Sequence, residues 1–287
     1  MAAGTINTNA RVVTDRGAAL FLRINENKTE DEAVYEARVV AHLASRGVAT
    51  PAPMVAQGGQ PFARLQGKPV TLFAWVTGRH LGAREVARRH VGHVGALLAR
   101  LHLCGADFPE RRPGIYTLEH IAARFRTFER SGDPKVSAAV PLIREELERL
   151  SRERTPGLPE GLIHQDLFRD NVLWDPDGDA IAAVIDFEQA AWGRWAYDLA
   201  VALLAWCFHD DDFDAALVDE MVRGYQAVRP LTDVERVALP MEARVAAVRF
   251  TVTRVTDVYL RSGAPSGKDF RSYFSRMRVL RERGLSF

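Results

Sequence analysis

The chain has 287 residues, 47% of them hydrophobic, so it can bury a large core and lies near the upper size of a single cooperative unit. Its 38 basic and 37 acidic side chains give a formal net charge of +1, which excludes a general attraction to nucleic acid or anionic lipid. Residues 1–8 lack a basic segment followed by an apolar run, and no run of about 18 apolar residues indicates a membrane span. We therefore expect two lobes in the cytoplasm, with neither a nucleic-acid nor a membrane partner.

Residues 1–77 are expected to form a small lobe of sheet with one helix. A polar turn at 14–17 between two short apolar segments predicts a β-hairpin, and apolar residues at helical spacing up to Gly47 predict a helix after it. Two later apolar runs flank a glycine-containing turn, and the second leads into a linker at 77–79. In order, the expected elements are strands at 10–13 and 18–24, a helix at 28–46, and strands at 54–56 and 69–76.

Residues 78–287 are expected to form a larger, mostly helical lobe, so the predicted fold class is α+β with two lobes. Apolar side chains recur there at helical spacing, with Pro or Gly at the breaks. The expected helices lie at 86–103, 118–129 and 137–154, with more from Tyr197 onward. Two short apolar segments, 172–174 and 181–185, are joined by a turn of Asp, Pro and Gly and predict a hairpin inside the helical lobe.

The segment from His164 to Asn171 reads His-Gln-Asp-Leu-Phe-Arg-Asp-Asn and lies just ahead of this hairpin, whose far strand ends at Asp186 and Phe187. Phosphoryl transfer requires an oriented acceptor hydroxyl and neutralised phosphate charge. Asp166 would accept the proton of the hydroxyl, and Asn171 and Asp186 offer the hard oxygen ligands that Mg²⁺ prefers. His164 is expected to support the loop. A lone Asp is usually a turn residue, but the combined spacing predicts a kinase site.

These motifs resemble the catalytic loop and the metal-binding Asp-Phe of protein kinases, but the activation-loop and Ala-Pro-Glu signatures are missing, and Tyr-Asp-Leu-Ala at 197–200 follows instead. The chain resembles the aminoglycoside phosphotransferase and choline kinase superfamily, and more closely its homoserine kinase branch, over nearly its whole length. The resemblance implies a protein-kinase-like fold, with a β-rich N-terminal lobe and a helical C-terminal lobe, and ATP-dependent phosphorylation of L-homoserine. Its segments are 7–9, 65–69, 101–103, 105–109, 163–171, 196–208, 224–226 and 228–231.

The resemblance also implies a phosphate site in the first lobe. A glycine-containing segment at 4–9 precedes the first strand, where a kinase nucleotide loop is expected, and Arg23 stands where the phosphate-binding lysine is expected. Glu36, on the helix that follows, is the expected partner of Arg23, with Glu32 as its competitor. Relatives usually carry roughly a helix and a strand before this point, so we expect a late start, through a misassigned start codon or a natural truncation.

The adenine ring is expected to lie against the linker between the lobes. Backbone groups of Ala74 and Val76 would bind its edge, and Leu173 and Ile185 would form an apolar floor, although core packing explains the same apolarity. The predicted cofactors are therefore ATP and Mg²⁺.

The acceptor is predicted to be a small molecule with a hydroxyl group. An amino acid such as homoserine presents an ammonium and a carboxylate, so Glu188 could hold the former and Arg169 or Arg194 the latter. The alternative is another amino alcohol, an aminoglycoside or a choline-like amine. Its positive charge would be met by Glu188 and the aspartates at 210–212, with Trp192 and Trp195 as a cation–π wall.

Two other classes of function stay open at this point. A nucleotide-binding pseudokinase without catalysis is plausible because Arg23 replaces lysine and the start is short, although Asp166, Asn171 and Asp186 are intact. Protein-kinase activity is weaker, since no activation segment is present on which a peptide could dock. The oligomeric state stays open between monomer and homodimer.

Overall fold

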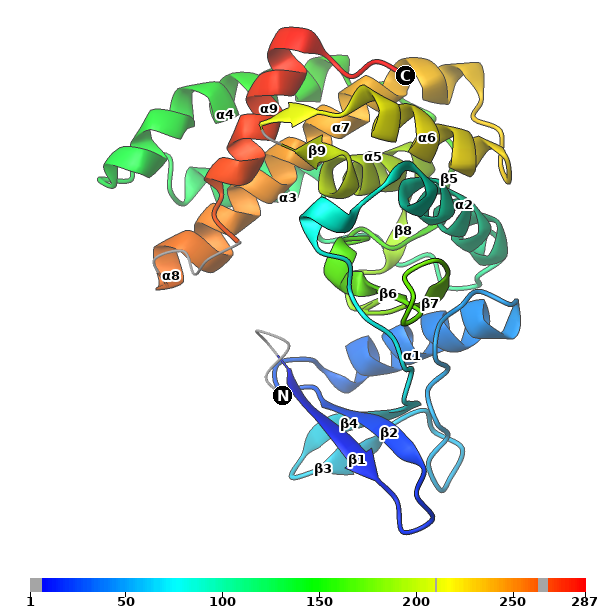
Figure 1. The fold of residues 1–287 in the computed structure, drawn as a ribbon. Helices are drawn as coiled ribbons and strands as arrows, with labels where there is room; N and C mark the ends of the chain where they lie inside the picture. The colour runs from blue at the N-terminus through cyan, green and yellow to red at the C-terminus, as the bar shows by residue number, and fades with distance from the viewer. Residues whose placement is uncertain (1–6, 210, 263–267) are drawn as a thin grey trace.

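The computed structural model describes residues 7–209, 211–262 and 268–287, and it has the two expected lobes (Figure 1). The smaller lobe is an antiparallel sheet of order β1-β2-β4-β3 with one helix. Its elements are β1 (Thr8–Val13), β2 (Ala19–Ile24), α1 (Glu30–Ser45), β3 (Ala63–Leu65) and β4 (Lys68–Ala74). The predicted α+β fold with a β-rich N-terminal lobe is confirmed.

Helix α1 begins at a capping box. The Thr29 side chain accepts a hydrogen bond from the Glu32 backbone N–H, and the Glu32 carboxylate accepts one from the Thr29 N–H at 2.8 Å. This reciprocal pair satisfies two of the donors that a helix start leaves free. Glu32 is therefore used at the helix start, which leaves Glu36 as the carboxylate facing Arg23.

The predicted strand at 54–56 is wrong. An isolated bridge between Pro53 and Phe73 lies just before that segment, the Met54 N–H donates to the Leu72 carbonyl oxygen, and β3 pairs with β4 as the regular strand instead. The turn between β3 and β4 has positive φ at both central residues, 51° at Gln66 and 79° at Gly67. Two such residues fit the tight hairpin turn that matches strand twist.

The larger lobe is built mainly of helices, as predicted. The helices are α2 (Arg88–Gly105), α3 (Leu118–Arg126), α4 (Pro134–Glu153), α5 (Trp195–Trp206), α6 (Ala215–Gln226), α7 (Asp233–Arg254), α8 (Leu260–Ser262) and α9 (Arg271–Arg283). Three strand pairs are inserted: β5 (Glu160–Ile163) with β8 (Ala191–Arg194), the predicted hairpin of β6 (Val172–Trp174) with β7 (Ile181–Val184), and β9 (Phe208–His209) with β10 (Asp212–Phe213). Within the described residues, no helix is both long and apolar enough to cross a bilayer.

The core of this lobe surrounds α5, whose residues from Ala196 to Trp206 are all buried. Helices α2 and α6 cross at backbone contact. A Cβ atom on Gly95 would lie 2.2 Å from the Met221 carbonyl oxygen, and one on Gly224 would lie 2.2 Å from the Gly92 oxygen. Only glycine allows this approach.

The linker between the lobes is bound to the β6–β7 hairpin. Arg79 and Trp174 exchange two backbone hydrogen bonds of 2.9 Å, and a Cβ atom on Gly78 would lie 2.6 Å from the Trp174 oxygen. On the other side, the Val184 N–H donates to the Ala49 carbonyl at 2.7 Å. The hairpin therefore lies between the lobes, where Figure 1 shows it above α1.

Candidate active site

The loop after β5 carries Asp166 and ends in η2 (Arg169–Asn171). The Asn171 side-chain amide donates to the Asp166 carbonyl oxygen at 2.7 Å and approaches the Asp166 carboxylate at 3.4 Å. His164 accepts a hydrogen bond from the Asp166 N–H at its Nδ1, 3.3 Å away, so its Nε2 is the protonated nitrogen and donates to the Ile185 carbonyl at 3.1 Å. His164 thus supports the loop.

The loop is anchored by the buried carboxylate of Asp198. It accepts hydrogen bonds from the backbone N–H groups of His164 (2.8 Å) and Gln165 (2.7 Å), and from the His102 ring at 3.1 Å. Burial raises the pKa of Asp198, but the hydrogen bond from His102 and the others outweigh burial and hold the pKa below its usual value. An ionised Asp198 therefore fixes the backbone just before Asp166.

Gln165 has a left-handed backbone conformation, with φ of 65°. Its backbone N–H donates to Asp198, and its carbonyl oxygen accepts a hydrogen bond from Arg249 at 2.9 Å. Such a conformation in a non-glycine residue is typical of functional loops that surrounding contacts hold in place. Here the contacts come from α5 and α7.

Asn171 and Asp186, the predicted metal ligands, are held together by the backbone. The Ile185 N–H donates to the Asn171 carbonyl oxygen at 3.0 Å, and Asp186 follows with a positive φ of 68°. Among the described residues, no group of three or more His, Cys, Asp or Glu side chains is placed to hold a metal by itself. One amide and one carboxylate nevertheless fit Mg²⁺, which keeps several waters and in kinases also binds phosphate oxygens of the substrate.

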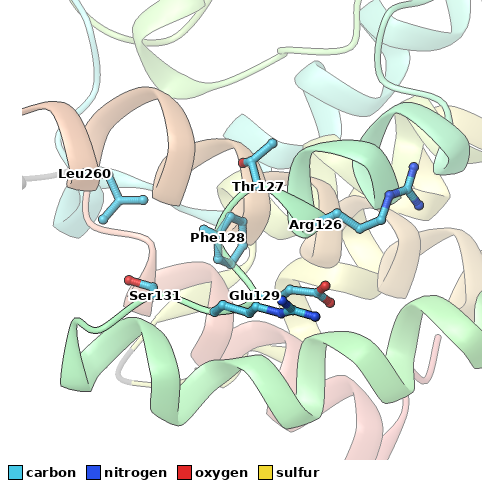
Figure 2. Close-up of a pocket in the computed structure, with 7 residues that line it drawn as sticks. Arg126, Thr127, Phe128, Glu129, Ser131 and Leu260 are labelled. Carbon is cyan, nitrogen blue, oxygen red and sulfur yellow. The ribbon is translucent and has the colours of Figure 1, made fainter.

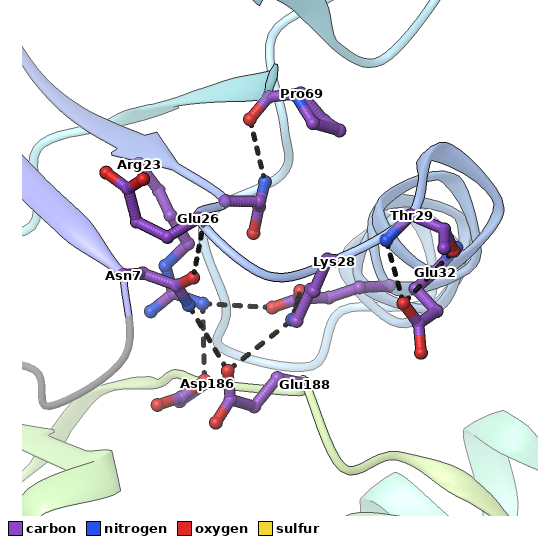
Figure 3. A network of polar contacts seen from close by, with 11 residues as sticks. Asn7, Arg23, Glu26, Lys28, Thr29, Glu32, Pro69, Asp186 and Glu188 are labelled. Carbon is purple, nitrogen blue, oxygen red and sulfur yellow. Dashed lines mark hydrogen bonds and ion pairs between the residues drawn. The ribbon is translucent and has the colours of Figure 1, made fainter. Parts of the chain in front are cut away.

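Arg23 spans the two lobes in the network of Figure 3. Its Nη1 lies 3.1 Å from Glu36 Oε1 and 3.2 Å from Asp186 Oδ1. Burial lowers the pKa of Arg23, but the charges of Asp186 and Glu36 outweigh that effect, so the guanidinium stays protonated. The structure thus brings Arg23 together with Glu36, the partner expected from the sequence.

Lys28, which the sequence reasoning missed, belongs to the same network. Its Nζ lies 2.6 Å from Glu36 and 3.5 Å from Glu188, and Asn7 donates to Glu188 at 3.3 Å. Burial, with the nearby charge of Asp186, raises the pKa of Glu188. Glu188 therefore lies beside cations of the small lobe (Figure 3), and its contact with the acceptor ammonium stays a prediction.

The residues predicted to contact adenine lie on two segments. One is the end of β4 with the linker that follows it, and the other is the β6–β7 hairpin. Ala74 ends β4 and Val76 follows in the linker, whereas Leu173 is in β6 and Ile185 follows β7. Because the linker is bonded to β6 at Arg79 and Trp174, these segments lie close together at the junction between the lobes. Their contact with adenine stays a prediction.

Arg194, predicted as a ligand of the acceptor carboxylate, is paired within the helical lobe. Its Nη1 binds Glu242 of α7 at 2.8 Å and the Thr155 carbonyl oxygen at 2.9 Å, so its charge is compensated by a buried glutamate. Arg194 is therefore not brought to the other acceptor residues. Arg169, in η2, is partly buried and forms no ion pair with a described residue, so it stays a candidate for the acceptor carboxylate.

The aromatic wall expected for an amine acceptor is not assembled. Trp195 packs under the Arg229 guanidinium at 4.3 Å, and Trp192 packs with Arg111 at 4.8 Å. Asp212 forms an ion pair with Arg283, and Asp211 accepts a hydrogen bond from Ser275 at 3.3 Å. Asp210, like residues 4–6 of the expected nucleotide loop, lies outside the described residues.

Three arginines were also missed: Arg249 and Arg254 on α7, and Arg276 on α9, which shares the Tyr273 ring with Arg254. Arg249 and Arg254 both interact electrostatically with the Asp166 carboxylate. A signal was present in the sequence, because Arg249 and Arg254 interrupt an apolar helical stretch, where charged residues are rarely buried without a reason.

A surface recess of about 420 Å³ lies where α3 ends (Figure 2). Its lining comprises Arg126, Thr127, Phe128, Glu129, Arg130, Ser131 and Leu260. None of the predicted catalytic, metal or nucleotide residues lines it. The candidate chemistry is therefore between the lobes and not in this recess.

Known proteins share the sequence pattern over most of the chain. The phosphotransferase enzyme family matches residues 1–238. The homoserine kinase of Methylobacterium sp. (strain 4-46) is 36% identical over 258 residues, which cover 90% of this chain and 79% of that protein. The homoserine kinase of Mesorhizobium japonicum is 35% identical over 289 residues, with 98% and 88% covered.

Solved structures share the fold. An amicoumacin kinase in complex with AMP-PNP and Ca²⁺ superposes with a TM-score of 0.77 at 15% identity, covering 98% of this chain and 87% of that one. A choline/ethanolamine kinase family protein from Mesorhizobium loti has a TM-score of 0.69 at 20% identity, with 98% and 86% covered. At these identities the likeness concerns the kinase-like fold alone.

Proposed function

Because this chain belongs to the phosphotransferase enzyme family, and matches homoserine kinases over most of their length, we propose that it transfers the γ-phosphoryl group of ATP to the hydroxyl of L-homoserine. The observation that carries the proposal is the assembled site. Asn171 is bonded to Asp166, and the backbone bond of Ile185 brings Asp186 beside them. An ATP-dependent small-molecule kinase needs these three groups in one place.

In this proposal, Asp166 is the general base. Its carboxylate orients the acceptor hydroxyl, whose oxygen attacks the γ-phosphorus while the bond to the β,γ-bridging oxygen of ATP breaks. The hydroxyl proton passes to Asp166, and ADP leaves. Burial raises the pKa of Asp166, which makes its carboxylate a better proton acceptor than an exposed one.

Asn171 and Asp186 would hold Mg²⁺, which neutralises phosphate charge when it is bound. Arg23 and Lys28 supply further positive charge from the small lobe, and Glu36 positions both of them. Arg23 keeps the charge of the lysine that it replaces, so the replacement does not remove the phosphate site. The complete set of charged groups argues against a non-catalytic nucleotide-binding module.

The test is ADP release by purified protein with Mg²⁺-ATP and one acceptor at a time: L-homoserine, choline, ethanolamine and an aminoglycoside. We expect release to require L-homoserine. In Asp166→Asn we expect kcat to fall by roughly 10²–10⁴-fold, the usual contribution of a general base. Asp177→Asn, in the exposed turn of the β6–β7 hairpin, should retain wild-type kinetics.

The Asp166→Asn variant should remain folded, with a thermal midpoint no lower than wild type at neutral pH, because burial makes an ionised carboxyl costly there. A preference for choline or an aminoglycoside would overturn the acceptor assignment. Full activity in Asp166→Asn would overturn the mechanism.

A further inference from the structure

The helical lobe contains a group of buried arginines without carboxylate partners. Arg249 donates to the carbonyl oxygen of Gln165 and to the side-chain oxygen of Gln189, and only 1% of it is exposed. Arg254 and Arg276 are partly buried, and no ion pair with a described residue is formed by either. This group lies next to the proposed general base, since both α7 arginines interact electrostatically with Asp166.

Other buried arginines of the same lobe show the usual arrangement. Arg229 binds Glu235 at 3.0 Å, and Arg244 binds Glu146 at 2.6 Å, in each case through a buried carboxylate. Burying a guanidinium without an anion is costly, so charge compensation is the rule inside proteins. Arg249, Arg254 and Arg276 differ in that no carboxylate of the described residues is bonded to them, so a bound anion would complete their charge compensation.

Two of these arginines, Arg254 and Arg276, pack on Tyr273. Its ring lies 4.4 Å from the Arg254 guanidinium and 4.6 Å from that of Arg276, and it packs 6.1 Å from Phe168 of the catalytic loop. The Tyr273 hydroxyl is buried and has no hydrogen-bond partner among the described residues. Burial raises its pKa to about 12, so the hydroxyl is protonated and can donate.

The guanidinium groups retain free donors. Arg254 uses Nη1 for Ser272 Oγ (2.8 Å) and for the Asp269 carbonyl oxygen (3.3 Å). Arg276 uses Nε and Nη1 for the carbonyl oxygens of Leu204 and Ser272. Within the part of the chain that the structure describes, Nε and Nη2 of Arg254 and Nη2 of Arg276 have no hydrogen-bond partner.

We propose that Arg254, Arg276 and the Tyr273 hydroxyl bind the carboxylate of the acceptor, with Arg169 adding charge from the catalytic loop. Arg169 interacts electrostatically with Arg276, so it belongs to the same group. Guanidinium groups bind carboxylates by charge-assisted, often bidentate, hydrogen bonds. The inference rests on the proposed function, because it places the acceptor hydroxyl at Asp166.

This site selects the chemical class of the acceptor. A hydroxy amino acid brings the missing negative charge, whereas choline, ethanolamine and aminoglycosides bring further positive charge into a group of arginines. A phosphate oxygen would also satisfy the arginines, but in the proposed function the phosphates of ATP would face Arg23 and Lys28 of the small lobe, which lie next to Asp186 and Glu188. The group on α7 and α9 is therefore assigned to the acceptor.

The burial-induced shifts agree with a missing anion. Burial lowers the pKa of Arg254 and that of Arg276 from the usual arginine value, and neighbouring arginine charges act in the same direction, whereas Tyr273 and nearby aspartates, Asp166 for Arg254 and Asp211 for Arg276, oppose the shift without outweighing it. The negative charge of a bound carboxylate would raise both pKa values.

The experiment compares L-homoserine with 3-amino-1-propanol, which keeps the amine and the hydroxyl but lacks the carboxylate. In wild type we expect homoserine to be strongly preferred. Arg254→Met should raise KM for homoserine by roughly 10–100-fold, the effect of losing charge-assisted hydrogen bonds, with KM for ATP unchanged. The preference over 3-amino-1-propanol should shrink by the same factor, and Arg254→Lys should restore part of it.

Tyr273→Phe provides a milder test, since it removes the hydroxyl and keeps the ring. We expect a KM increase for homoserine of roughly 3–10-fold and none for 3-amino-1-propanol. Arg278→Met, an exposed position on the same helix as Arg276, should behave as wild type. Thermal melting separates a local effect from misfolding, because removal of an uncompensated charge should leave the midpoint unchanged or higher.

Equal losses on both acceptors, or a rise in KM for ATP, would overturn the carboxylate site and leave the kinase assignment intact. Equal use of L-homoserine and 3-amino-1-propanol by the wild-type protein would also overturn the carboxylate site and leave the kinase assignment intact. No turnover of either acceptor by wild type would overturn the proposed function and this inference with it.

Discussion

At the residue scale, the catalytic loop is held by polar contacts that compensate backbone strain. The left-handed conformation of Gln165 costs about 1–3 kcal/mol in a non-glycine residue. Two contacts offset it: the Asp198 carboxylate accepts from its N–H, and Arg249 donates to its carbonyl oxygen. Because both partners come from buried helices, the position of Asp166 depends on residues far away in sequence.

Arg249 should also set the pH dependence of activity. Burial raises the pKa of Asp166, and the positive charge of Arg249 acts in the opposite direction. Since Asp166 accepts a proton only when it is ionised, kcat/KM should fall as the pH drops through this raised pKa. Arg249→Met removes the charge, so the acid limb of the pH profile should move to higher pH.

Arg249→Lys keeps the charge and is the control, with an acid limb expected near that of wild type. The measurement is kcat/KM for homoserine as a function of pH. Superimposable profiles for wild type and Arg249→Met would contradict the role of Asp166 as the titrating base.

The predicted site residues that the structure brings together are those with local spacing in the sequence. Asp166 and Asn171 are five positions apart on one loop, and the adjoining hairpin returns the chain to Asp186, so short-range pattern was sufficient. The pairing of Arg194 was not foreseen, because its partner, Glu242, lies on α7 and nothing near Arg194 in the sequence indicates that contact. Arg254 was missed for the same reason.

At the element scale, the helical lobe depends on the backbone contact between α2 and α6. The Gly95→Ala change would place a methyl group 2.2 Å from the Met221 carbonyl oxygen, which a backbone cannot avoid by a rotamer change. We expect a loss of about 2–3 kcal/mol in the free energy of unfolding, in the range found for overpacked cores. The thermal midpoint should fall by roughly 5–10 °C.

Gly132→Ala is the matched control, because a Cβ atom there meets nothing within 4 Å. Its midpoint should stay near that of wild type. Equal midpoints for Gly95→Ala and wild type would show that α2 and α6 are farther apart than described.

Elements with a strong local pattern were predictable, and those with distant partners were not. The hairpin β6–β7 was expected from its turn, and most of the long helices from their spacing. By contrast, β5 and β8 are four-residue strands, and the whole catalytic loop and the hairpin lie between them. β3 was missed because its turn uses Gln66 before Gly67, a weaker signal than Asn-Gly.

At the scale of the whole molecule, the two lobes are joined at the site itself. Arg23 and Lys28 of the small lobe reach Asp186 and Glu188 of the large lobe, in addition to the linker contacts. Any ligand that binds both lobes should therefore stabilise the folded chain as a unit.

Mg²⁺-ATP should raise the thermal midpoint. At a concentration about 100 times Kd, binding adds about 2.7 kcal/mol, which corresponds to roughly 5–10 °C for a protein of this size. Asp186→Asn should lose the part of the shift that depends on Mg²⁺, measured with and without a chelator. The control Asp177→Asn should keep the Mg²⁺-dependent part of the shift. A Mg²⁺-dependent shift in Asp186→Asn equal to that of wild type would exclude Asp186 as a metal ligand.

The most direct test of phosphoryl transfer from ATP to homoserine at Asp166 is ³¹P NMR of the complete reaction. We predict a new phosphomonoester signal, split by the two protons of the adjacent methylene group, that grows with ADP in wild type and is absent in Asp166→Asn. ADP accompanied only by inorganic phosphate, or an equal phosphomonoester signal from Asp166→Asn, would contradict the account.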